Sequence, residues 1–317
     1  MKMEEAIQDA MPIIDEMLGQ WNVDIRMRPI QASSLFVEQF LRLKNDEKIT
    51  GEYANKPWFK EILKLTISWY HKRYSNFFKN NKIGYLTSLA LIYNTPFLLT
   101  IPQIIVAEDE KDKITKITYP DKKFDNEIVW DFVVDCPDIS ELEIETKKEL
   151  EIAIEESIST IRRIYLHTIS AKFESPESGR MANSIIKHIE TAANNIANPQ
   201  KKDFSLGIWE IFFALEKTFK SYLNQRGVDF PKNHNIKDLL LLANSNGVNI
   251  DEKKLDPFPN EKEIIKYRYH EIDPPKMSTM INSYFSALEI INICTSKFSR
   301  KVILNNATFF IKKAIWQ

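Results

Sequence analysis

Glycine is scarce in this sequence, at 7 of 317 residues, whereas an ordinary protein holds about 7% glycine. Loops that cradle phosphates need several closely spaced glycines, and neither GxGxxG nor GxxxxGKS/T occurs in the chain. The shortage excludes nucleotide-binding loops of these two kinds. It also favours long helices, which seldom contain glycine.

Cysteine and histidine are also few. Cys136 and Cys294 stand 158 positions apart, too far to form a zinc knuckle, and nothing indicates a disulfide framework. The five histidines are scattered singly and no HExxH is present, so we predict no metal site and no cofactor. We expect free thiols in a reducing compartment and a cytoplasmic location, because the acidic, amphipathic start of the chain is unlike a secretion signal.

The balance of charge excludes a global basic field. The formal net charge is −1, with 44% apolar and 27% charged residues, an ordinary globular composition. Any site for nucleic acid must therefore be a local basic surface.

One uncharged run, residues 83–107, is long enough to raise the question of a membrane span. Pro96 and Pro102 interrupt it, together with Asn94, Thr95 and Gln103. We predict buried strands with a turn at Asn94-Thr95-Pro96, and no membrane partner.

The periodicity changes along the chain. Residues 1–50 are predicted helical with a break near 26–31, and residues 57–79 form a further helix. Runs rich in β-branched and aromatic residues predict three or four strands between 83 and 135, as a small antiparallel meander that includes "EIVWDFVVD". From 141 to the end the pattern is helical.

Several helix ends are predicted in the second half. A capping box, Thr146 with Glu149, is expected near the start of a helix over 147–173. Another helix runs from Asn235 to Gly247, and further helices begin at Asp273-Pro274 and at 300. The predicted fold is mostly α (α+β), with a helix-and-strand domain over 1–140 and a helical bundle over 141–317.

The order of segments in the second half carries a resemblance. A helix with "LEKTFKSYL" precedes an H-x-x-x-D-L motif (His234, Asp238, Leu239), and a K-x-R-Y motif (Lys266, Arg268, Tyr269) precedes the long helix with "INSYFSALEII". Residues 175–300 thus resemble a HEPN domain, a helical bundle found in prokaryotic toxin–antitoxin, nucleotidyltransferase-partner and phage-defence proteins.

The resemblance implies one of two functions. Many HEPN domains are metal-independent ribonucleases that use an Arg and a His with four to six residues between them, usually across a dimer; others lack the pair and bind or regulate. In such chemistry His takes the 2′-hydroxyl proton and Arg holds the phosphate charge. Here that spacing occurs only in "RRIYLH", Arg162 to His167, which precedes the resembling region. The alternative is a helix whose arginines offset Glu155 and Glu156.

The loop around 226–237 is a first candidate binding site. It brings Arg226, Lys232, His234 and Lys237 to the start of a predicted helix. Backbone donors at a helix N-terminus favour anions, so a phosphate contact is one interpretation. The other is a connector in which His234 or Asn235 caps the helix.

A second candidate is "KYRYH", with Lys266, Arg268 and His270 among two tyrosines. Mixed basic and aromatic residues stack on and neutralise nucleotides. The alternative is cations beside a helix C-terminus. We expect the basic face of 57–79 (Lys60, Lys64, Lys72, Arg73, Lys79) to be solvated, and His71 and His188 to be structural or exposed.

Three functions follow as hypotheses. The first is an RNA- or nucleotide-binding protein of a prokaryotic defence or toxin–antitoxin type, expected as a homodimer. The second is a metal-independent ribonuclease using Arg162 and His167, or Arg268 and His270, across a dimer. The third is a module without catalytic activity that docks a cognate partner protein.

Overall fold

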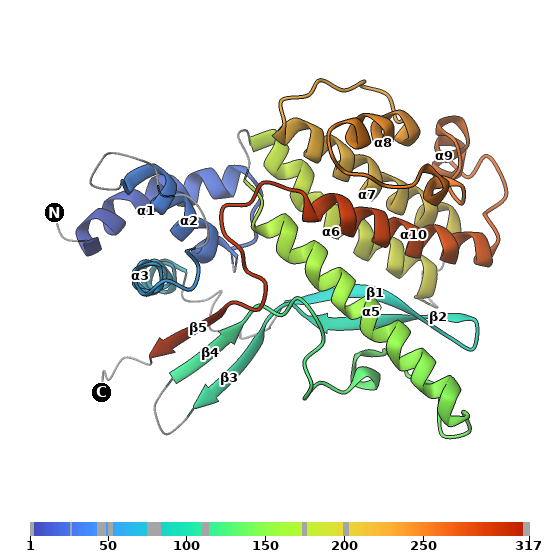
Figure 1. Ribbon diagram of the computed structural model, residues 1–317, viewed down its shortest axis with the longest axis horizontal. Helices are drawn as coiled ribbons and strands as arrows, with labels where there is room; N and C mark the ends of the chain where they lie inside the picture. Colours follow the sequence, from blue (N-terminus) through green and yellow to red (C-terminus); the bar gives the residue numbers. More distant parts are fainter. Residues whose placement is uncertain are drawn as a thin grey trace.

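The computed structural model describes residues 3–25, 27–42, 49, 53–74, 84–109, 114–172, 176–198 and 203–312. It is mostly helical with small antiparallel sheets whose strands, one excepted, lie in the N-terminal half, which confirms the predicted fold class (Figure 1).

Three helices form the N-terminal end of the molecule. They are α1 (Met3–Gln20), α2 (Arg28–Phe40) and α3 (Pro57–Arg73), and they pack on one another. The break between α1 and α2 comes earlier than the predicted 26–31: Asn22 has a φ of 54°, and residues 28–31 already lie in α2, with Pro29 in its first turn. Arg28 closes the corner by an ion pair of 2.9 Å with the buried Asp15. The prediction extended α3 to 79, but residues 75–79 lie outside those described.

The uncharged run folds as a hairpin. Strands β1 (Tyr85–Ile92) and β2 (Thr95–Pro102) pair through a two-residue turn at Tyr93 and Asn94. Of the predicted turn residues only Asn94 lies in the turn, because Thr95 and Pro96 begin β2. Both turn residues have positive φ, 52° and 57°, which matches the turn twist that joins adjacent antiparallel strands. In the parts of the chain described here, no helix has the length and apolar character needed to span a membrane.

The second sheet corrects the prediction of a single meander. Strands β3 (Ile105–Asp109), β4 (Ile114–Thr118) and β5 (Thr308–Lys312) form it in that order, so the last strand comes from the C-terminal end. The helix predicted after 300 is therefore wrong at 308–312. The local pattern explains this: Phe309 is buried and Phe310 exposed, the alternation of a strand.

Three further expectations need correction. The run "EIVWDFVVD" is not a strand: residues Val129–Phe132 form the short 3-10 helix η1, and only Val133 bridges to Leu99. The helix after it begins at Ile144, so Thr146 lies inside its first turn and makes no capping box. The last long helix begins at Met277 rather than at Asp273.

The remaining helices build the C-terminal bundle. They are α5 (Ile144–Ile169), α6 (Pro176–Ala197), α7 (Phe204–Gln225), α8 (Ile236–Ser245), α9 (Glu261–Arg268) and α10 (Met277–Ser296), with the 3-10 helix η2 (Glu252–Leu255) between α8 and α9. As predicted, Asn235 caps α8 and Gly247, with a φ of +99°, follows its end.

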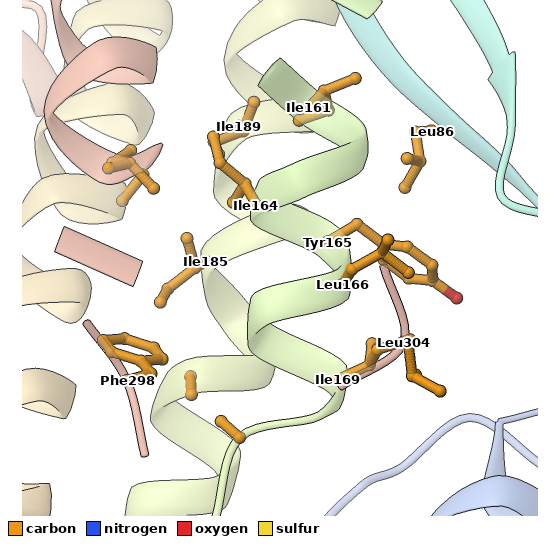
Figure 2. Close-up of a cluster of buried hydrophobic side chains, with 14 of the residues drawn as sticks. Leu86, Ile161, Ile164, Tyr165, Leu166, Ile169, Ile185, Ile189, Phe298 and Leu304 are labelled. Atoms are coloured by element: carbon orange, nitrogen blue, oxygen red, sulfur yellow. The ribbon is translucent and has the colours of Figure 1, made fainter. Parts of the chain in front are cut away.

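Helix α5 lies at the centre of the core. Figure 2 shows Ile164 of α5 close to Ile185 and Ile189 of α6, whereas Tyr165 and Leu166 extend from the opposite side of α5, where Leu86 of β1 and Leu304 lie. The strand pairing of β5 with β4 and the packing of α5 and α6 on β1 both cross the boundary predicted at 140. The division into two domains stays a prediction.

Candidate functional site

One face of α7 carries a second stripe beside its buried one. Trp209, Phe213, Glu216 and Lys220 are spaced by four, three and four residues, which aligns their side chains along the helix. The neighbouring stripe, with Phe212 and Phe219 among its members, is fully buried in the bundle. The stripe from Trp209 to Lys220 is therefore the face on which other segments of the chain converge.

The loop before α8 brings His234 to this face. Its Nδ1 donates to Glu216 Oε2 over 2.8 Å, and Lys220 Nζ donates to Glu216 Oε1 over 2.7 Å. Glu216 is only 3% exposed, and each of its two carboxylate oxygens has a hydrogen-bond partner, as a buried carboxylate requires. The His234 side chain remains 39% exposed, with its ring 5.5 Å from that of Phe213.

Helix α6 supplies a second pair of the same kind. His188 Nδ1 donates to Glu210 Oε2 over 2.6 Å, and the His188 ring lies 5.9 Å from that of Phe213. Two histidines, each held through Nδ1 by a glutamate of α7, thus lie against one phenyl ring. In such a pair the carboxylate fixes the ring orientation and leaves Nε2 for other partners.

Helix α9 completes the arrangement with a stacked arginine. The Arg268 guanidinium lies 4.6 Å from the Trp209 ring and 5.6 Å from the Tyr269 ring. Trp209 in turn lies 4.3 Å from Phe213. Tyr269 is 62% exposed, so the stack ends in an open aromatic face.

These side chains form a continuous row, called here the α7 row: Tyr269, Arg268, Trp209, Phe213, His234 and His188. It joins two segments that the sequence marked separately, the loop with His234 and the "KYRYH" segment. A further bond links them, because the His234 backbone N–H donates to Glu261 of α9 over 3.1 Å.

The other predicted residues of the first loop lie apart from the row. Arg226 stacks on Tyr222 at 4.1 Å, beyond the end of α7, and its Nε lies 3.4 Å from the Asn246 carbonyl. Lys232 is exposed, and Lys237 lines a separate cavity of 530 Å³ beside α9. The cap of α8 is made by Asn235 and not by His234.

The remaining residues of the second segment also diverge. Lys266 is exposed. His270 points toward Asp203, 3.7 Å away, and lines a cavity of 790 Å³ with the acidic residues Glu271 and Asp273. Arg268 and His270 are therefore directed to different surroundings, one to the aromatic row and the other to an acidic hollow.

The structure gives Arg162 a structural partner. Its side chain is fully buried, and its two terminal nitrogens each donate to Glu127 over 2.7 Å. The neighbouring Arg163 pairs with Glu156 over 2.6 Å, which agrees in part with the charge-offset interpretation. A guanidinium enclosed in this way does not reach an RNA phosphate at the surface.

His167 is buried as well. Its Nδ1 lies 3.1 Å from Thr295 Oγ1, and burial, with Arg300 and Arg163 nearby, lowers its pKa from 6.5 to about 4. The imidazole is therefore neutral near pH 7 and enclosed, which does not suit a base that must reach a 2′-hydroxyl.

The described residues contain no clustered metal ligands, and their two cysteines are not joined. Among the described residues, no group of three or more His, Cys, Asp or Glu side chains is arranged to hold a metal ion. Cys136 is exposed and Cys294 buried, and both are free thiols.

Comparison with known proteins gives no relative: no family model, curated protein or solved structure matches this chain.

Sequence reasoning missed His188, Glu210, Glu216, Trp209 and Phe213 as parts of a site. The spacing of Trp209, Phe213, Glu216 and Lys220 was the available signal, a polar and aromatic stripe beside an apolar one. Nothing local marks His188, because its partner Glu210 lies on another helix.

Proposed function

We propose that this chain is an RNA- or nucleotide-binding protein with a HEPN-like bundle, of a prokaryotic defence or toxin–antitoxin type. The order of α7, loop, α8, insert, α9 and α10 supports the bundle. The observation that carries the binding function is the stack of Arg268 on Trp209 and Tyr269.

The chemistry of the stack suits an unpaired nucleotide. The exposed ring of Tyr269 offers a face on which a base stacks, and the Arg268 guanidinium offers planar donors to a phosphate. Base-on-aromatic stacking contributes about 1–3 kcal/mol per base.

The surrounding charge sets the ligand class. Glu261, Glu263 and Glu271 flank Lys266 and Arg268 on and just after α9, so the surface is not strongly basic. We therefore expect affinity from stacking and from only one or two phosphate contacts, which gives a shallow salt dependence. Short single-stranded RNA fits this surface better than a duplex, whose bases are already stacked.

The test is binding of a fluorescently labelled, mixed-sequence RNA of about 12 nucleotides, followed by anisotropy. Arg268→Ala is expected to weaken binding by about tenfold, in line with loss of one stacked and charged contact. Arg73→Ala is the matched control, because Arg73 also stacks between a tryptophan and a tyrosine, Trp69 and Tyr74, at the end of α3. Equal losses in both variants, or no binding by the unaltered protein, would overturn the proposal.

A second candidate function rests on the paired histidines. RNA cleavage without metal needs one base and one acid: the 2′-oxygen loses its proton and attacks phosphorus, and the 5′-oxygen leaves with a proton, giving a 2′,3′-cyclic phosphate. His188 and His234, each oriented by a glutamate against Phe213, have the chemical character for the two roles.

Cleavage is tested with the same RNA in EDTA, with the ends of the products identified. The candidate function predicts cyclic phosphate ends, a bell-shaped dependence of rate on pH, and loss of cleavage in both His188→Asn and His234→Asn. His71→Asn, at an exposed histidine of α3, is the control. An uncleaved RNA that still binds would remove the ribonuclease and leave the binding function standing.

A further inference from the structure

The N-terminal third of α5 projects from the body of the molecule. In the view of Figure 1 this end of the helix extends below the β1–β2 hairpin. Ile144 is 75% exposed and Ile152 is 69% exposed, the two most exposed large apolar side chains of the described residues. The buried stretch of α5 begins only at Ile154.

The two isoleucines share one outward face. With 3.6 residues per turn, Ile144 and Ile152 lie about 80° apart around the helix. The buried stripe, with Ile154, Ile158 and Ile161, lies about 120–180° around the helix from Ile152 and about 40–100° from Ile144, and it packs against the bundle and the β1–β2 hairpin. Ile152 is therefore turned away from the core, whereas Ile144 is exposed because it stands in the first turn, before the buried stretch of α5 begins.

The same outward face is acidic. Glu145, Glu149, Glu155 and Glu156 surround the isoleucines, and Lys148 and Arg163 offset only part of their charge through contacts with Glu145 and Glu156. The wider segment 131–156 contains ten acidic residues and two lysines, a formal net charge of −8. The chain as a whole carries −1, so the rest of it carries +7.

We infer that this face of α5, named here the α5 acidic face, is a docking surface for a cationic amphipathic helix of a partner protein. Single exposed apolar residues are ordinary. Two large ones on one helix face, ringed by like charges, follow the usual plan of an interface, with an apolar centre and a polar rim. The partner supplies apolar side chains to Ile144 and Ile152 and lysines or arginines to the glutamates.

Charge complementarity selects this occupant over others. The glutamates repel RNA and the anionic surface of a membrane. They also repel a second copy of the same face, which disfavours a symmetric dimer through it. The inference is independent of the RNA-binding function, which concerns α7 and α9.

The test uses synthetic helices as probes, with the full chain as it is. The first probe is a labelled Leu/Lys peptide of about 18 residues with its leucines on one face; the second has the same composition with the leucines scattered. A third probe replaces lysine by glutamate. Wild-type protein is expected to bind the first at least about tenfold more tightly than the second, and to leave the third unbound.

Variants locate the binding. Ile144→Ser with Ile152→Ser is expected to reduce affinity for the first probe to that for the second. Ile13→Ser, at a 61% exposed isoleucine of α1, is the matched control and is expected to change nothing. Glu145→Gln with Glu149→Gln is expected to weaken both cationic probes and flatten their salt dependence.

All substituted side chains are exposed, so circular dichroism is expected to report an unchanged fold. Equal binding of the first two probes, or full binding by the double serine variant, would overturn the docking surface.

Discussion

At the scale of single residues, Arg162 shows that the same sequence spacing is compatible with a catalytic pair and with a buried structural ion pair. "RRIYLH" has the separation of a ribonuclease Arg and His, yet Arg162 is enclosed and holds Glu127 with two bonds of 2.7 Å. Glu127 lies 35 positions away in sequence, so no local pattern reveals the pair. The sequence shows which residue types are present. Their burial, which decides what they can do, depends on how α5 packs.

Removing Arg162 is expected to destabilise the fold strongly. Arg162→Met leaves the Glu127 carboxylate, 13% exposed, without its partner, and we expect a loss of about 3–5 kcal/mol in the free energy of unfolding. Arg162→Met with Glu127→Gln removes the uncompensated charge and is expected to recover much of that loss. Urea unfolding measures both. If the free energy of unfolding of Arg162→Met lay within about 1 kcal/mol of the wild-type value, the structural role of the Arg162–Glu127 pair would be contradicted.

His167 predicts a dependence of stability on pH. Its folded pKa of about 4 lies below its ordinary value of 6.5, so the unfolded chain binds this proton more readily. The contribution of His167 is therefore present above pH 6.5 and is lost as the pH falls toward 4, by at most about 3 kcal/mol.

The measurement compares urea midpoints of wild type and His167→Gln across that window. The variant is expected to show the shallower fall, because glutamine does not titrate. Parallel curves for the two proteins would show that His167 is not held neutral.

At the scale of elements, the sequence predicted local features better than pairings. The α8 cap at Asn235, the stop at Gly247 and the interruption of the uncharged run near Asn94 all depend on neighbouring residues, and the structure has them. The sequence did not predict strand β5 because that strand forms by pairing with β4, whose residues lie almost 200 positions earlier in the chain. An isolated run such as "TFFIK" suits a helix or a strand until its partner is known.

Because β5 is a strand, its two neighbouring phenylalanines differ in burial. Phe309 pairs opposite Ile117 and is 3% exposed, whereas Phe310 is 53% exposed. Phe309→Ala is expected to cost about 3 kcal/mol or more, and Phe310→Ala less than about 1 kcal/mol. Thermal and urea unfolding of the two variants check this, and similar costs at both positions would argue against the β5 strand.

At the scale of the whole molecule, the candidate site is assembled from four separate segments: α6, α7, the loop before α8 and the end of α9. The sequence marked the loop with His234 and the "KYRYH" segment, but it did not show that both meet on α7 or that His188 joins them. Such a meeting depends on how α6, α7 and α9 pack, and helix periodicity says which face is apolar without saying which helix covers it. The distribution of charge differs in this respect, because the net charge of −8 over residues 131–156 of a nearly neutral chain can be counted from the sequence alone.

The central claim is that RNA binds along the α7 row. The most direct measurement is photo-crosslinking of a short RNA containing 4-thiouridine to the full chain, followed by mass spectrometry of the attached peptides. We expect crosslinks at Tyr269, Arg268 or Phe213, and we expect unlabelled RNA to suppress them. Crosslinks confined to other surfaces, such as the lysine-bearing face of α3, would contradict the claim, as would their absence at concentrations where the RNA is bound.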